Sequence, residues 1–185
     1  KMPVFYSCTA KMLFDLGKKN DKYKIQFKKS IRFLNENDII AIFTICNQAI
    51  EIGLEDVVLS YLESINLTPV LEEKFLELLC LKETISIRQM DILSKIDLNL
   101  YKDRIDVAYL KAKIEESKGH ELNSIKLYEK SYLDNYNLRA WFKYIQLSIK
   151  NKSEIKEKII DTPPENNNIN VLMMKAEAYR YNGKY

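Results

Sequence analysis

Apolar residues along this chain recur at the three- and four-residue spacing of amphipathic α-helices. Four such segments are each fourteen residues long and end directly before a glycine: Pro3–Leu16, Ile39–Ile52, Ile105–Lys118 and Ile169–Asn182. Glycine readily takes the left-handed backbone conformation that closes a helix. The pattern therefore predicts four helices that end at Gly17, Gly53, Gly119 and Gly183.

Second helices are predicted between these four, from apolar residues at the same spacing. They cover Tyr23–Leu34, Val57–Ile65, Ile85–Ile96 and Ile125–Tyr132. Clusters of Asn, Asp and Pro, which favour turns, separate the helices at residues 35–38, 67–69, 97–103, 135–137 and 162–168. The last cluster is either a linker or an enlarged loop, and the helical pattern that resumes in phase after it favours the loop. About eleven helices and no strand are predicted, so the fold class is all-α.

The four glycines also recur at a regular interval. Their spacings are 36, 66 and 64 residues, so five periods average about 33 residues. Two positions in the series lack a glycine. Near residue 85 the chain has the ordinary turn residues Thr84 and Ser86, and near residue 151 it has Asn151, which turns left-handed more readily than most residues. A period of this length is typical of repeats built from helix pairs.

Each unit is counted so that its glycine is position fifteen. In the first and the last unit, large residues fall at positions four and eleven and a small residue falls at position eight. The first unit has Tyr6, Ala10 and Leu13, and the last has Leu172, Ala176 and Tyr179. These residues resemble the tetratricopeptide repeat family. The resemblance implies a right-handed superhelical α-solenoid of about five and a half antiparallel helix pairs, a single domain over residues 1–185, with helices touching at the small residues.

The chain departs from this family pattern at several positions. Lys111 stands where the family prefers leucine, Lys22 stands where it prefers alanine, and the third unit fits poorly. The resemblance therefore implies a divergent array rather than a regular one.

Two narrower resemblances fall on residues 124–144. Ser124–Ser131 followed by Asn137–Phe142 resembles a repeat junction in the tetratricopeptide subunits of the anaphase-promoting complex, whereas Trp141–Tyr144 resembles the half-a-tetratricopeptide repeats of RNA-processing scaffolds. Both imply a non-catalytic protein–protein interaction scaffold. The first would be a subunit of a ubiquitin-ligase assembly that controls the cell cycle. A chaperone-associated adaptor ranks lower. Its peptide clamp needs lysine and asparagine at positions five and nine of one repeat, and neither Ser7 with Lys11 nor Phe43 with Asn47 supplies that pair.

The resemblance also implies a concave groove that binds peptides of other proteins. In the family, positions five, nine, twelve and thirteen of each first helix point into this groove. The corresponding candidates, besides Ser7 and Glu177, are Lys11, Phe43, Asn47, Tyr109, Lys113, Lys143, Met173, Arg180 and Tyr181. Lys113, Lys143 and Arg180 would form a basic line and favour an acidic, amphipathic ligand. Alternatively, several of these residues are ordinary exposed side chains, or are covered by a neighbouring helix or by a second subunit.

Charge and hydropathy narrow the list of partners. The 185 residues include 29 basic and 26 acidic side chains, and the basic runs are interleaved with acidic residues, so a nucleic-acid partner is not expected. The longest uncharged apolar stretch, Ile39–Ile50, is shorter than the roughly 20 residues that cross a bilayer, so no membrane association is expected. No secretory signal is visible. An intracellular location, nucleus or cytoplasm, is expected for a chain that reads as a fragment of a longer protein.

Catalytic and metal-binding patterns are missing from the sequence. The single histidine, His120, has no Cys or His at ligand spacing, and no glycine-rich phosphate loop is present. We therefore expect neither enzymatic activity nor a cofactor. Cys8 and Cys46 lie at or near small-residue positions, where cysteine serves as a small core residue.

Self-association is a further expectation. The segments Ile39–Ile50 and Val70–Leu81 carry more large apolar side chains than a helix pair obviously needs. Such an excess indicates either a homodimer interface or deeper burial within the array.

Overall fold

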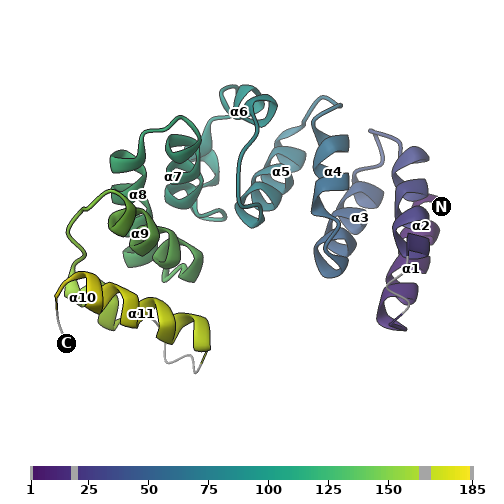
Figure 1. Cartoon of the computed structure of the whole chain (residues 1–185). Coiled ribbons are helices and arrows are strands. Elements are labelled where there is room, and N and C mark those ends of the chain that lie inside the picture. Colours follow the sequence, from purple (N-terminus) through teal and green to yellow (C-terminus); the bar gives the residue numbers. More distant parts are fainter. Residues whose placement is uncertain (1, 18–20, 163–167, 184–185) are drawn as a thin grey trace. The chain divides into compact units, whose positions relative to one another are not determined.

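The computed structural model describes residues 2–17, 21–162 and 168–183. All regular secondary structure in these residues is helical, which confirms the all-α prediction. The α-helices are labelled in Figure 1. The chain divides into two compact units. Unit 1 comprises Lys1–Lys82 with Ile87–Ile96, and unit 2 comprises Glu83–Ser86 with Asp97–Tyr185. One continuous right-handed superhelix over 1–185 stays a prediction.

The described part of unit 1 contains six helices: α1 (Met2–Asp15), α2 (Asp21–Arg32), α3 (Ile39–Ile52), α4 (Glu55–Leu62), α5 (Pro69–Leu81) and α6 (Ile87–Leu93). A short 3₁₀ helix and five α-helices form the described part of unit 2: η1 (Leu98–Tyr101), α7 (Val107–Ser117), α8 (Glu121–Asn135), α9 (Leu138–Lys150), α10 (Glu157–Asp161) and α11 (Ile169–Tyr181). Several helices that follow one another pack together in both units, among them α1 with α2, α3 with α4 and α7 with α8. Most of the predicted turn at 162–168 lies outside the described residues.

The four predicted helix ends are confirmed. Gly17, Gly53, Gly119 and Gly183 all have a positive φ, between 69° and 80°. After Gly53 and Gly119, the next backbone N–H donates to a carbonyl five residues back, over 2.9 Å in both cases. This hydrogen bond satisfies a carbonyl that the helix itself leaves without a partner.

The prediction for the end of α9 is wrong by one residue. Asn151 keeps a φ of −91°, and Lys152 takes the left-handed conformation with φ 53°. The N–H of Ser153 then donates to the carbonyl of Ser148 over 2.9 Å, the same closure that follows Gly53 and Gly119. Asn151 instead donates from its side chain to Glu121 (2.7 Å) and to the carbonyl of Leu147 (2.9 Å). Lys152 therefore occupies the place of the missing glycine.

The apolar segments of α3 and α5 supply the core of unit 1. Ile42, Ile45, Phe75 and Leu79 are fully buried, and of the large residues in these helices Ile40 is the most exposed, at 81%. Deeper burial, the alternative to an interface, accounts for the abundance of apolar side chains in Ile39–Ile50 and Val70–Leu81. The predicted homodimer loses that support.

Of the four small residues that were expected in the core, Ala176 and Cys8 are exposed instead. Ala10 is fully buried, as expected, but Ala176 is exposed because α11 packs through Val171 and Ala178. Cys46 is buried, and its burial raises the pKa of the thiol to about 12. The prediction of a core role for Cys8 is wrong, because Cys8 is exposed and its Sγ accepts a hydrogen bond from Gln48 over 3.2 Å.

A single carboxylate joins three helices of unit 2. Asp106 caps α7 by accepting the N–H of Tyr109 over 2.9 Å. Its other oxygen accepts from Ser131 of α8 (2.6 Å) and from the side chain of Asn137 (2.8 Å). Asn137 is in turn the N-cap of α9, where it accepts the N–H groups of Arg139 and Ala140. This network sets α7, α8 and α9 in register.

Candidate functional site

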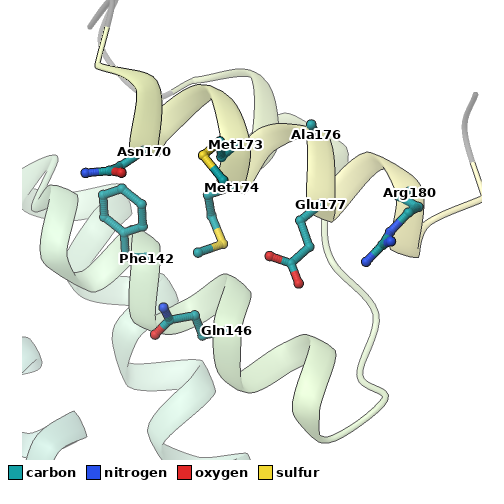
Figure 2. Close-up of a pocket in the computed structure, with 8 residues that line it drawn as sticks. All are labelled: Phe142, Gln146, Asn170, Met173, Met174, Ala176, Glu177 and Arg180. Carbon is teal, nitrogen blue, oxygen red and sulfur yellow. The ribbon is translucent and has the colours of Figure 1, made fainter.

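An open groove of about 730 Å³ lies between α9 and α11 in unit 2 (Figure 2). Two residues of α9 and six of α11 line it: Phe142, Gln146, Asn170, Met173, Met174, Ala176, Glu177 and Arg180. Its volume lies in the range of about 300–1,000 Å³ that is usual for ligand sites. The groove is therefore large enough to hold several side chains of a partner.

The buried faces of the two helices aim these side chains into the groove. Trp141 and Tyr144 turn one face of α9 into the core, which leaves Phe142 half-buried and Gln146 exposed. The side chain of Asn182 donates to the carbonyl of Ile155 over 2.9 Å and holds the end of α11. The lining is consequently presented by two anchored helices rather than by loops.

The centre of the groove is apolar and its flanks are polar. Met174 reaches from α11 toward α9 between Phe142 and Gln146, and Asn170 lies beside the Phe142 ring (Figure 2). Methionine is flexible and polarisable, so such a centre adapts to apolar side chains of different shape. Glu177 and Arg180 lie farther along α11 and are exposed. Neither has an ion-pair partner within the described residues, so both charges are available to a ligand.

The structure brings together only some of the predicted groove residues. Met173 and Arg180 line the groove, and so does Glu177. Tyr181, 37% exposed, lies on the same helix outside the lining. Phe142 and Gln146 were missed by the sequence analysis. When Lys152 is position fifteen, Phe142 and Gln146 occupy positions five and nine, as Met173 and Glu177 do in the next unit.

The predicted basic line does not form. Lys113 is only 1% exposed, and its ammonium lies 5.4 Å from the ring centroid of Tyr109, which is itself buried. The expectation that Tyr109 and Lys113 face a groove is therefore wrong. The ring centroid of Tyr109 lies 5.6 Å from that of Tyr128. Tyr109 therefore belongs to the contact between α7 and α8 rather than to a groove surface.

Lys143 has an internal partner. Its ammonium lies 2.8 Å from a carboxylate oxygen of Glu116, and the other oxygen of Glu116 accepts the hydroxyl of Tyr128 over 2.6 Å. Burial and this hydrogen bond raise the pKa of Tyr128, so the hydroxyl keeps its proton. Of the three predicted cations, only Arg180 is left to meet a ligand in the groove.

The remaining predicted residues belong to unit 1. Lys11 forms ion pairs with Glu51 (2.6 Å) and Asp15 (3.4 Å), and the hydrogen bond to Glu51 raises the pKa of Lys11. Phe43 is half-buried and Asn47 is exposed.

A lysine that sequence analysis did not single out covers Phe43. The ammonium of Lys74 lies 5.5 Å from the Phe43 ring centroid and 2.5 Å from Glu77. Lys74 and Lys113 share this arrangement, a lysine over the aromatic residue at position five. Neither ring is presented as a free apolar surface.

The described residues contain no group of three or more His, Cys, Asp or Glu side chains that could hold a metal ion. His120 is exposed, and its Nδ1 lies 2.9 Å from a carboxylate oxygen of Glu115. None of the described helices is both long and apolar enough to cross a membrane.

Comparison with family models, with curated proteins and with solved structures finds no match to this chain.

Proposed function

We propose that this protein is a non-catalytic scaffold that binds a segment of another protein in the groove between α9 and α11. The observation that carries the proposal is the groove itself, in which an apolar centre and exposed polar flanks are presented by two anchored helices. Recognition of helical or extended segments commonly uses such surfaces. The resemblance to tetratricopeptide repeats supports the same function, because Phe142 and Met173 occupy equivalent positions in successive units.

The groove also indicates the chemistry of the bound segment. Phe142, Met173 and Met174 suit a large apolar side chain, which would gain free energy by leaving water. Glu177 and Arg180 carry opposite charges, so the segment should carry a basic group and an acidic group in the matching order. This proposal replaces the strongly acidic ligand that the predicted basic line implied. Membership of a ubiquitin-ligase assembly or of an RNA-processing scaffold stays a prediction.

Two neighbouring residues of α11 provide a matched test. Met173 is 64% exposed and lines the groove, whereas Leu172 is 51% exposed and does not. Peptides are first selected on the wild-type protein from a random peptide library. We expect Met173→Glu to weaken their binding by about tenfold or more, because a carboxylate replaces an apolar contact.

The control is Leu172→Glu, which we expect to change the affinity by less than about twofold. Circular dichroism of both variants checks that helicity is preserved. Equal losses in the two variants, or no loss in either, would contradict the proposed site.

A further inference from the structure

A second pocket, of about 520 Å³, lies between α7 and α8, and none of its lining residues belongs to the groove described above. Ile114 and Leu127 contribute apolar side chains to it, one from each helix. Three lysines surround them: Lys111, Lys118 and Lys126. Lys111 is the residue that stands where the resembled repeats have leucine, and its side chain is exposed.

The charges around this pocket are unbalanced. Glu115 is the one acidic side chain among the described lining residues, and it already binds Lys118 (3.5 Å) and His120 (2.9 Å). Lys111 and Lys126 have no ion-pair partner within the described residues. The pocket therefore presents two uncompensated ammonium groups beside an apolar surface.

We propose that this pocket binds an acidic segment of a partner protein that inserts one leucine- or isoleucine-sized side chain between Ile114 and Leu127. The carboxylates of the segment would lie against Lys111 and Lys126, since complementary charge speeds and orients association. The apolar stems of the lysines would extend the contact along the inserted side chain. This surface is separate from the groove, so the two proposals stand or fall independently.

The lining favours a protein over a nucleic acid. Proteins that hold single-stranded nucleic acids generally stack the bases on aromatic side chains. Among the described residues that line this pocket, none is aromatic. An aliphatic surface with a lysine rim instead matches an aliphatic side chain flanked by carboxylates.

The test uses the full chain and a fluorescein-labelled, capped pentapeptide, Glu-Glu-Leu-Glu-Glu, followed by fluorescence anisotropy at low salt. A second probe has glycine in place of leucine. We expect the leucine probe to bind several-fold more tightly than the glycine probe, because only the leucine fills the apolar part of the pocket. We expect Lys111→Glu/Lys126→Glu to weaken binding of the leucine probe by about tenfold or more.

The matched control is Lys130→Glu/Lys158→Glu, which changes the net charge equally on two exposed lysines of the same unit. It should change the dissociation constant by less than about twofold. Methyl NMR of Ile114 and Leu127 gives a second readout, in which both resonances should shift with the leucine probe. Equal losses in the two double variants, unshifted methyl resonances, or tighter binding of a uridine oligonucleotide than of the leucine probe would overturn the proposal.

Discussion

The indole Nε1 of Trp141 donates a hydrogen bond to the backbone carbonyl of Ile159 over 2.8 Å. Both residues are buried, and the bond fastens the five-residue helix α10 to α9. A helix this short is not stable by itself, so its position depends on such tertiary contacts. Because α11 packs on both α9 and α10, the same bond supports one wall of the groove.

Trp141→Phe should therefore destabilise the protein by about 2–4 kcal/mol, because it leaves a cavity and a buried carbonyl without a donor. Urea unfolding followed by circular dichroism measures this effect, since Trp141 is the only tryptophan and fluorescence is lost in the variant. Tyr136→Phe, at a position that is 69% exposed, serves as the control and should be nearly neutral. Equal stability of wild type and Trp141→Phe would show that the hydrogen bond and its packing contribute little.

The left-handed helix ends predict substitutions of opposite sign. Gly119→Ala should cost about 1 kcal/mol, because alanine disfavours a φ of 80° even though its Cβ would meet no atom within 4 Å. Lys152→Gly should stabilise the protein by a similar amount, because it removes that penalty. Thermal or chemical unfolding of the two variants beside the wild type measures both changes. A shift of the same sign in both would contradict the assigned conformations.

These helix ends show what could be read from the sequence and what could not. A glycine spaced at the repeat interval marks a left-handed residue, because glycine takes that conformation without strain, so four ends were predictable. Lysine carries no such signal, and Lys152 adopts a positive φ only because α9 closes there. The candidate chosen in this unit was Lys143, which is position six when Lys152 is position fifteen and so lies one residue beyond Phe142 at position five. Phe142 and Gln146 were therefore missed as groove residues.

Burial of charged residues was equally hard to predict. Lys113 occupies a position that the repeat pattern directs into the groove, and nothing in the sequence singles out Lys74, yet both lie over aromatic rings. Their environment is set by side chains of neighbouring helices, which the spacing within one helix does not reveal. Met173 and Arg180 line the groove because α11 follows its glycine-marked register, and their contact with a peptide stays a prediction.

Two alanines at the same repeat position should respond differently to enlargement. Ala10→Leu should destabilise by about 1–3 kcal/mol, because Ala10 is fully buried where α1 packs. Ala176→Leu should change stability by no more than about 0.5 kcal/mol, because Ala176 is exposed. Unfolding midpoints of the two variants make the comparison. A larger loss for Ala176→Leu than for Ala10→Leu would be incompatible with the packing of α11 described above.

Two carboxylates of unit 2 should make stability depend on pH. The hydrogen bond from His120 is the main cause that lowers the pKa of Glu115 below its usual value of 4.5, and hydrogen bonds from Lys150 and then Asn151 lower that of Glu121. A folded-state pKa below the unfolded-state value adds stability above about pH 4.5. That stability is lost as the pH falls through the folded-state pKa.

We therefore expect the unfolding free energy of the wild type to fall more steeply below about pH 4.5 than that of Glu115→Gln/Glu121→Gln. Urea unfolding of both proteins at successive pH values measures the difference between them. That difference should shrink toward zero at the acid end. A constant difference across the pH range would contradict this role of the two carboxylates.

The central claim, that the groove between α9 and α11 binds a protein segment, is tested most directly by NMR of methionine methyl groups. The chain has five methionines, of which Met173 and Met174 line the groove. Met2 and Met12 are as exposed as Met173, at 66% and 64% against 64%, but lie in unit 1 and serve as internal controls. On titration with a library-selected peptide, the account predicts that the Met173 and Met174 resonances shift together and saturate while those of Met2 and Met12 stay in place. Saturable binding that shifts Met2 or Met12 and leaves Met173 and Met174 unmoved would contradict it.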